Sequence, residues 1–389
     1  MISWCKTKLG DCCEIISGST PSTNVESFWN GSICWATPKD LSQLDGAYIS
    51  DTPRKLTQSG LDSCGATILP SNSVLFSSRA PIGHVAVNTV PMATNQGFKS
   101  FVPKDNRVYA KFLYHWLRKN RAYLESLGNG ATFKEVSKTI VSRVEILLPS
   151  LEEQKRIAEI LDRAEELRSK RREAIAQLDT LTQAIFIEMF GDPVVNPKLH
   201  PVVRLGSLTK ISSGSTPSRK QPENFDGNIP WVKTTEVNGG LITDTEEKIT
   251  ESALQNSSCH VYPMGSILIA LYGQGKTRGQ CAVLGIEAAT NQACGVLLPN
   301  PNYITNFLFA QLSMSYSRLR AMARGGNQEN LNLGLIADFT VLLPSLPLQK
   351  EFARRIEALE RLKTAHRASL SELDALFASL QHRAFRGEL

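Results

Sequence analysis

The residues with the most evident chemistry lie in two short loops rich in long polar side chains. One loop carries Ser78 and Arg79, and the matching loop later in the chain is three residues longer and carries Tyr272, Gln274, Lys276 and Arg278. Arg and Lys can pair bidentately with guanine edges, and Gln can pair with adenine. Such loops could read bases, although an exposed basic hairpin without a ligand would have the same composition.

The same region holds the only hint of an enzyme. Gly275-Lys276-Thr277 follows an apolar run and resembles the end of a phosphate-binding P-loop. That motif needs Gly where Ala270 stands and a helix after the threonine, whereas Arg278-Gly279-Gln280 leads into another apolar run. Methyltransferase, dinucleotide and zinc-protease motifs are missing from the sequence. We therefore expect a non-catalytic chain, with a nucleotide hydrolase as the enzymatic alternative.

Other candidate contacts occur twice. Ala93-Thr94-Asn95-Gln96 returns as Ala289-Thr290-Asn291-Gln292, and Ser17–Ser22 returns unchanged as Ser213–Ser218. Because both copies are alike, a shared structural task or a phosphate contact is favoured over base discrimination. The small hydroxyls of the serine-rich loop suit either phosphate contacts or a tight turn. Trp35 and its counterpart Trp231 are expected in the core.

These elements belong to a duplicated unit of half the chain length, because the matches keep an offset of 195 to 196 residues. Each copy begins with short strand-like runs, such as residues 73–77 and 266–270, and continues with helical segments near 109–127 and 304–323. The duplication predicts a pseudo-twofold axis. We expect an α+β fold in each copy, with a small twisted sheet or half-barrel plus helices.

A long charged helix follows each globular part. From Ser150 to about Phe190, apolar residues alternate steps of three and four, as in a coiled coil, and the pattern returns at the C-terminus. Ser150 and Glu153 form a predicted capping box at its start. An isolated run of this kind could equally be a core helix or a homodimer zipper. Two such helices, each after a similar domain, favour a pair of spacers about 60 Å long.

Composition adds weaker constraints. Residues 1–150 hold 16 Lys and Arg against 11 Asp and Glu, whereas residues 151–193 hold 7 against 10, so the globular part is basic and the helix mildly acidic. This suits a polyanion bound by the domains. The eight cysteines lack zinc-ligand spacing and are expected as buried thiols, with Cys12-Cys13 as the one conceivable metal or redox pair. Without a signal peptide or membrane span, a cytoplasmic location is expected.

Taken together, the motifs resemble those of the specificity subunits of type I restriction-modification systems. The resemblance rests on the repeated Ser-Gly-Ser-Thr-Pro loop, Gly227-Asn228-Ile229-Pro230-Trp231, Thr-Asn-Gln, Leu-Pro-x-Leu-x-x-Gln-Lys at 148–155 and 343–350, and Phe385-Arg386-Gly387-Glu388-Leu389. It covers essentially the whole chain. In the first copy Cys34 replaces the Pro of Gly-x-Ile-Pro-Trp and Ala36-Thr37-Pro38-Lys39 follows, which puts a base contact by Lys39 in doubt.

The resemblance implies a division of labour. Target-recognition domains at 1–149 and 194–344 would each read half of a bipartite, asymmetric double-stranded DNA site, and helices at 150–193 and 345–389 would pack antiparallel and set the spacer. Two modification subunits carrying S-adenosylmethionine would dock on this scaffold, and restriction subunits using ATP and Mg would join them; no cofactor is expected on this chain. A coiled-coil adaptor that binds proteins is the alternative.

The resemblance and the loop chemistry together give two sets of candidate residues. The expected DNA contacts are Thr20, Lys39, Ser78, Arg79, Asn95, Gln96, Lys134, Thr216, Lys233, Tyr272, Gln274, Lys276, Arg278, Asn291, Gln292, Asn327 and Gln328. The expected helix interface is Ile157, Ile160, Leu167, Arg171, Leu178, Leu181, Phe352, Leu359, Leu362, His366, Leu373 and Leu376. Antiparallel pairing would place Arg171 near His366 and Ser369, as a polar layer that fixes the register.

Overall fold

The computed structural model describes residues 4–130, 134–273, 275–323 and 330–389. The chain divides into two compact units. Unit 1 comprises residues 1–171 and 369–389, and unit 2 comprises residues 172–368. Each unit therefore contains one globular part and half of each of the two long helices, α7 (Leu151–Phe190) and α13 (Leu346–Ala384).

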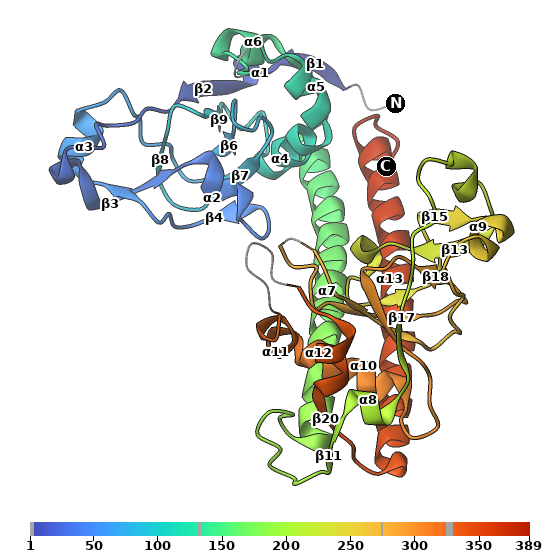
Figure 1. The fold of residues 1–389 in the computed structure, drawn as a ribbon. Helices are drawn as coiled ribbons and strands as arrows, with labels where there is room; N and C mark the ends of the chain where they lie inside the picture. Colours follow the sequence, from blue (N-terminus) through green and yellow to red (C-terminus); the bar gives the residue numbers. More distant parts are fainter. Residues whose placement is uncertain (1–3, 131–133, 274, 324–329) are drawn as a thin grey trace. The chain divides into compact units, whose positions relative to one another are not determined.

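The two globular parts have the same sheet topology, which confirms the predicted duplication (Figure 1). Each has a five-stranded mixed sheet, a three-stranded sheet and a two-stranded ladder. In unit 1 these are β2-β9-β6-β7-β4 (Cys13–Ser17, Lys99–Pro103, Val74–Phe76, Val85–Asn88, Tyr48–Ile49), β5-β3-β8 (Lys55–Leu56, Trp29–Ala36, Ala93–Thr94) and β1-β10 (Cys5–Lys8, Glu145–Leu148). In unit 2 they are β12-β19-β16-β17-β14 (Ile211–Ser213, Cys294–Leu297, Ile267–Ala270, Cys281–Leu284, Leu241–Ile242), β15-β13-β18 (Glu247–Ile249, Ile229–Val232, Ala289–Thr290) and β11-β20 (Val202–Arg204, Thr340–Leu342).

Short helices join these strands. Unit 1 contains α1 (Leu9–Cys12), η1 (Glu26–Phe28), α2 (Pro38–Ser42), α3 (Gln58–Asp62), α4 (Ala110–Lys119), α5 (Arg121–Ser126) and α6 (Lys138–Arg143). Unit 2 contains α8 (Leu205–Leu208), η2 (Pro222–Phe225), η3 (Thr234–Glu236), α9 (Glu251–Gln255), α10 (Thr305–Met314), α11 (Tyr316–Ala321) and α12 (Leu333–Asp338). The helical segment predicted in each copy is thus a pair, α4 with α5 and α10 with α11.

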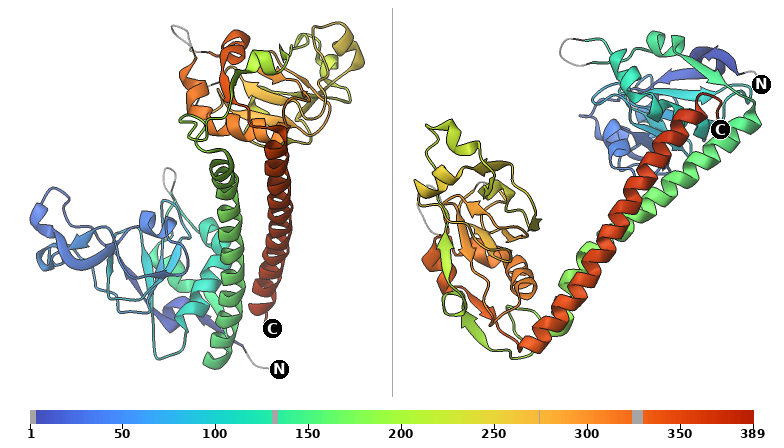
Figure 2. Two further views of the ribbon diagram at one scale, coloured as in Figure 1. Left: turned by 90° about the horizontal axis from the view of Figure 1, so that it is seen from below. Right: turned by 90° about the vertical axis from the view of Figure 1, so that its right-hand side faces the viewer.

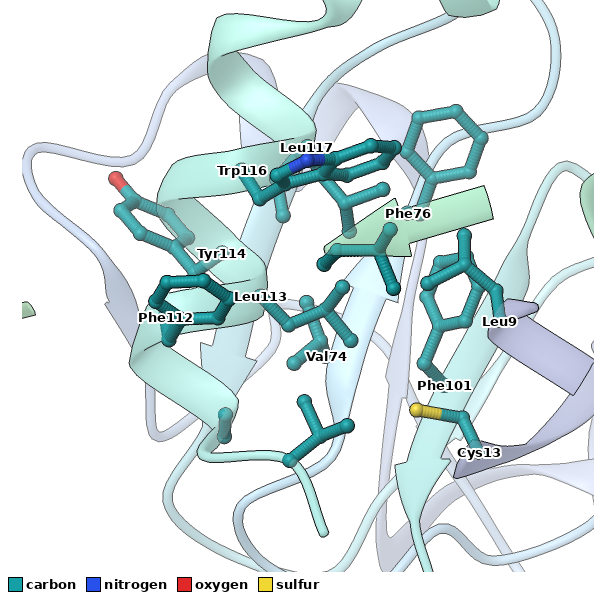
Figure 3. Close-up of a cluster of buried hydrophobic side chains, with 14 of the residues drawn as sticks. Leu9, Cys13, Val74, Phe76, Phe101, Phe112, Leu113, Tyr114, Trp116 and Leu117 are labelled. Carbon is teal, nitrogen blue, oxygen red and sulfur yellow. The ribbon is translucent and has the colours of Figure 1, made fainter. Parts of the chain in front are cut away.

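The core of unit 1 lies between α4 and the five-stranded sheet (Figure 3). Phe76 and Phe101, on neighbouring strands, have ring centroids 6.1 Å apart, and Phe112 and Leu117 of α4 are fully buried against the same cluster. The opposite face of this sheet is also buried, because Leu75 of β6 and Ala86 of β7 belong to a second cluster, and the central strands are therefore continuously buried rather than alternating. Trp35 and Trp231 are both buried, as predicted.

The start of each long helix is fixed by a buried glutamine. Gln154 accepts a hydrogen bond from the Tyr109 backbone N–H at 2.8 Å and donates to the carbonyls of Arg107 and Pro149. Gln349 accepts from the Ile304 N–H at 2.9 Å and donates to the Pro344 carbonyl. Both side chains are fully buried. The repeated Leu-Pro-x-Leu-x-x-Gln-Lys motif thereby ties each helix to the start of α4 or α10.

Of the predicted capping box, the serine half is present. The Glu153 backbone N–H donates to the Ser150 hydroxyl at 3.3 Å. The Glu153 carboxylate instead receives two hydrogen bonds from Arg156, at 2.7 and 2.8 Å.

Within each unit the halves of α7 and α13 run side by side in opposite directions (Figure 2). In unit 1, Ile157, Leu161 and Ala164 share a cluster with Phe377 and Ala384. In unit 2 the corresponding cluster contains Leu178, Phe186, Phe190, Phe352, Ile356 and Leu359, together with Phe307 of α10.

The residues of the predicted helix interface differ in burial. Ile157, Leu178, Phe352 and Leu359 are buried, and Ile160, Arg171, His366 and Leu373 are half-buried. Leu167, Leu181, Leu362 and Leu376 are 41 to 51% exposed, and their place in the interface stays a prediction. Leu161 is fully buried and the Arg168 side chain is only 14% exposed, so both lie deeper than their neighbours Ile160 and Leu167.

Polar pairs within each unit stabilise the helix pairing. Arg168 donates to Asp374 at 2.6 Å in unit 1, and Lys363 lies 3.2 Å from Asp179 in unit 2. The repeat relates these two pairs residue for residue. Arg171 belongs to unit 1 and His366 to unit 2, so the polar layer proposed between them stays a prediction.

The described residues contain neither a membrane-spanning helix nor a cluster of metal ligands. No described helix is long and apolar enough to cross a membrane. Across the same residues, no three His, Cys, Asp or Glu side chains gather as a metal site, and all eight cysteines are free thiols.

Candidate nucleic-acid interface

The two repeated polar motifs come together in each unit. The Ser19 backbone N–H donates to the Thr94 carbonyl at 2.9 Å, and the Ser215 N–H donates to the Thr290 carbonyl at the same distance. The next residue, Thr20 in one unit and Thr216 in the other, donates its hydroxyl proton to the side chain of Gln96 or Gln292. The serine-rich loop and the Thr-Asn-Gln segment therefore form one conserved frame.

The glycine in this loop is required by close packing. A Cβ on Gly18 would overlap the carbonyls of Thr94 and Asn95, and one on Gly214 would overlap the carbonyl of Thr290. Any side chain would push the loop away from the Thr-Asn-Gln segment.

Asparagine and glutamine have different tasks within the frame. Asn95 accepts a hydrogen bond from the Gly97 N–H at 2.9 Å, and Asn291 accepts from the Thr234 hydroxyl at 2.9 Å. The side-chain carbonyl oxygens of both asparagines thus accept hydrogen bonds inside the protein. Gln96 and Gln292 are exposed and lie beside a threonine hydroxyl, so they are available to a ligand.

In unit 1, Arg79 lies beside an acidic residue. Its guanidinium is 3.7 Å from the Glu135 carboxylate, which also accepts a hydrogen bond from the buried Lys99 at 3.0 Å. Lys99 offsets much of the negative charge of Glu135, so the group formed by Arg79, Lys99 and Glu135 carries a net positive charge. Lys134 is exposed nearby, whereas Ser78 is fully buried and donates to the Gly97 carbonyl at 3.1 Å.

In unit 2 the corresponding loop is held in place by hydrogen bonds from α11. Arg320 donates to the carbonyls of Gly275 and Arg278 at 2.7 and 3.3 Å, and the Tyr316 hydroxyl donates to the Lys276 carbonyl at 2.8 Å. Because backbone carbonyls carry these contacts, the side chain of Lys276 stays exposed, as does Tyr272.

The loop does not have the surroundings of a P-loop. Thr277 is followed by a turn and then by strand β17 rather than by a helix. The helix N-terminus that would bind a nucleotide phosphate in a P-loop is therefore not at this position.

Lysines expected at the interface differ in availability. Lys39 is exposed in the first turn of α2. Lys233 lies between Glu246 at 2.5 Å and Glu247 at 3.3 Å, and the hydrogen bond that its ammonium group donates to Glu246 raises the pKa of Lys233. Its charge is neutralised within the protein. Gln274, Asn327 and Gln328, also predicted as contacts, lie outside the described residues.

Two arginines at the frame were missed by sequence reasoning. The Arg54 guanidinium carbon lies 3.7 Å from the ring centre of Trp29 and 4.9 Å from that of Trp35. Arg219 lies 4.0 Å from Phe225 and 5.2 Å from Trp231 in the same way. The shared spacing of six between the two aromatic residues of each unit was the only available signal, and it does not indicate which cation lies above them.

Sequence comparison places this architecture among known proteins. Residues 1–177 and 197–374 match the profile of the family described as type I restriction modification DNA specificity domain. The chain is 28% identical over 374 residues to the type I restriction enzyme MjaIX specificity subunit of Methanocaldococcus jannaschii, covering 92% of this chain and 86% of that protein. It is 24% identical to the EcoKI specificity subunit of Escherichia coli K12, covering 80% and 73%.

Two solved structures share the fold. The S subunit of a type I restriction-modification system from M. genitalium aligns with a TM-score of 0.61 at 16% identity, covering 99% of this chain and 96% of that one. A chain solved in work on complex assembly and conformational transition of the type I R-M system aligns with a TM-score of 0.65 at 20% identity, covering 100% and 98%.

Proposed function

Because this chain belongs to the family of type I restriction-modification DNA specificity subunits, we propose that each of its units reads one half of a bipartite double-stranded DNA site. The chain is a non-catalytic recognition component with two target-recognition domains. The observation that supports the reading mechanism is that both units keep one frame of serine-rich loop and Thr-Asn-Gln segment while their neighbouring loops differ. A shared frame suits contacts common to both halves, and the divergent loops suit base selection.

The proposed base contacts are the cations and polar groups of those loops that are at least partly accessible to solvent. In unit 1 these are Arg79 and Lys134, and in unit 2 they are Tyr272 and Lys276. Gln96 and Gln292 contact the DNA in both halves. A location in the compartment that holds the DNA, the cytoplasm expected from the sequence, suits this role.

The partners we propose are two modification methyltransferase subunits and, through them, restriction subunits. S-adenosylmethionine would be bound by the methyltransferases, and ATP with Mg by the restriction subunits. Leu167 and Leu362, and likewise Leu181 and Leu376, are equivalent exposed residues of the long helices. Apolar side chains repeated on both helices suit two identical partners, one for each half.

Methylome sequencing tests the proposal. DNA from cells that express the chain with its modification subunits should carry adenine methylation at one bipartite motif. An Arg79→Ala variant should relax one half of that motif and leave the other unchanged, at about 1–3 kcal/mol of lost discrimination. Lys6→Ala, an exposed lysine of β1 paired with Glu145, is the matched control and should leave the motif unchanged. An assembled complex without motif-specific methylation would contradict the proposal.

A further inference from the structure

Each unit covers the same aromatic pair with a guanidinium, but the two guanidiniums come from different places in the chain. In unit 1 the rings are Trp29 and Trp35, 5.1 Å apart and nearly perpendicular. In unit 2 they are Phe225 and Trp231, 5.5 Å apart at 71°. Arg54 precedes β5, whereas Arg219 lies between β12 and η2. Repetition of the motif alone therefore does not account for the shared arrangement.

Backbone geometry identifies the residue of unit 2 that occupies the place of Arg54. In unit 1 the Trp35 N–H donates to Thr52, whose hydroxyl donates to the Arg54 carbonyl at 2.8 Å. In unit 2 the Trp231 N–H donates to Thr245, whose hydroxyl donates to the Glu247 carbonyl at 2.7 Å. Glu247 is thus the structural counterpart of Arg54, with the opposite charge.

The guanidinium is nevertheless present in unit 2, because Glu247 binds one from elsewhere. Arg219 donates to the Glu247 carboxylate at 2.7 Å and lies over Phe225 and Trp231. A charge reversal at this backbone position has therefore not removed the cation above the rings. In the two units, different chain segments supply a guanidinium above the aromatic pair. This indicates that the guanidinium itself has a function there.

The place of this group connects it with the conserved frame. The Trp35 indole donates to the Ser19 carbonyl at 3.0 Å, and the Trp231 indole donates to the Ser215 carbonyl at 3.0 Å. Each aromatic pair thus supports the serine-rich loop, and Arg54 and Arg219 are exposed beside it. Stacking on a ring restricts the guanidinium and leaves its N–H donors directed outward, a geometry suited to phosphate oxygens.

We infer that Arg54 and Arg219 are DNA backbone contacts, one for each half of the site, in which an arginine held on two aromatic rings binds a phosphate. The inference rests on the proposed DNA-reading function and adds a sequence-independent contact to it. Sequence independence follows from the comparison of units, since the arrangement is kept while the reading loops change.

The two contacts differ in strength. Arg219 and Lys233 face Glu246 and Glu247, so the local charge in unit 2 is balanced. At Arg54 the described residues place no carboxylate within salt-bridge distance, and the nearby Lys55 is paired with Asp51 at 2.9 Å. A phosphate must displace a carboxylate at Arg219 but not at Arg54. We therefore assign the larger share of binding to unit 1.

The test measures the DNA affinity of the full chain in complex with its modification subunits at several salt concentrations. One duplex contains the motif identified by methylome sequencing, and the other has the same bases in scrambled order. Arg54→Ala should weaken binding to both duplexes roughly tenfold and reduce the slope of log affinity against log salt by about one. Arg54→Lys, which keeps the charge, should retain the slope. Glu247→Gln should steepen the slope, because it releases Arg219. Lys6→Ala removes the same charge on β1, which lies at the opposite end of unit 1 from β3 and α3 (Figure 1).

The outcomes separate this inference from the proposed function. If the wild-type complex selects its motif but Arg54→Ala matches Lys6→Ala in slope and affinity, the arginine only packs on the rings and the inference is wrong. If Arg54→Ala relaxes one base position, Arg54 reads a base and the phosphate assignment is wrong. A wild-type complex that selects no motif would instead overturn the proposed function. Retained specificity for the unit 2 half of the motif in Arg54→Ala would show that this variant chain is folded.

Discussion

The joint between globular part and long helices contains a group of charged residues in unit 1, whereas unit 2 has a larger cluster of aromatic rings in the same region. In unit 1, Asp162 of α7 accepts from His115 at 2.7 Å and lies 2.8 Å from Lys111, and both of these α4 side chains are buried. The repeat places Asn306 and Ala310 at the corresponding positions of α10.

In unit 2 the joint is instead an aromatic cluster. Phe307 lies 5.6 Å from Phe186 and 4.8 Å from Phe190, and Phe352 lies 5.5 Å from Phe190. The buried glutamine at the start of each helix is the same in both units. The difference teaches that the glutamine fixes where the helix starts. The contacts farther along the helix can differ between the units, provided that they pack closely and leave no buried charge unpaired.

The largest effect that tests this contrast is expected from Phe190→Ala. Phe190 is fully buried among three other phenylalanine rings, and its loss should reduce the free energy of unfolding by about 3–5 kcal/mol. The matched change Phe385→Ala in unit 1 removes a partly buried ring that contacts Phe112, and should cost about 1–2 kcal/mol. Chemical denaturation measures both. Equal losses would mean that the joints do not differ in aromatic packing.

Asp162→Ala should come next, at about 3 kcal/mol, because it leaves the buried Lys111 without its carboxylate. Glu357, the repeat counterpart in unit 2, is exposed, and Glu357→Ala should change stability by less than about 0.5 kcal/mol. Hydrogen exchange should show faster exchange in α4 for the first variant only. Unchanged protection of α4 would show that Asp162 does not hold the joint.

Removing the shared glutamine should affect both units alike. Gln154→Ala and Gln349→Ala each leave buried backbone groups without a partner, at about 2 kcal/mol. Thermal unfolding of the two variants checks the equality. A much smaller loss for one of them would limit the role of the glutamine to the other unit.

The smallest effect is a pH dependence confined to unit 1. Burial lowers the pKa of His115, although its hydrogen bond to Asp162 opposes this. Burial also acts to raise the pKa of Asp162, but hydrogen bonds from His115 and Lys111 outweigh it and lower that pKa. A histidine kept neutral in the folded state contributes stability above its unfolded pKa of about 6.5, and this contribution is lost as the pH falls below that value.

Between pH 7.5 and 5.5, wild type should therefore lose up to about 1 kcal/mol more stability than His115→Asn, in which the side chain cannot titrate. Lys111 and Arg118 of α4 and Asp162 and Glu165 of α7 remain in both proteins. Unfolding midpoints at the two pH values give the comparison. Parallel losses in the two proteins would assign the pH dependence to other groups.

Much of the fold could be predicted from the sequence, because the sequence contains two copies of the same structural unit. The duplication, the two long helices and the buried Trp35 and Trp231 follow from spacing alone. The exposure of Leu167 and Leu362 could not be foreseen, because the neighbouring Arg168 and Lys363 are the more buried residues and are held there by Asp374 and Asp179 of the opposite helix.

The candidate site was predictable only in part, for a similar reason. Repetition identified Gln96 and Gln292, but the neighbours of Lys233 and the rings beneath Arg54 come from distant segments. Spacing within one segment contains no information about such partners. Only the structure therefore shows that Lys233 is paired with carboxylates and that Arg54 lies over two rings.

The hold of α11 on the loop of unit 2 affects how recognition could change between relatives. Arg320 and Tyr316 bind carbonyl oxygens at Gly275, Lys276 and Arg278, so they support the loop whatever side chains it bears. If the loop reads bases as proposed, point changes within it should alter the base preference while these backbone contacts are kept. A graft of this loop onto another scaffold would then need α11 to accompany it, and loop and helix would be exchanged together.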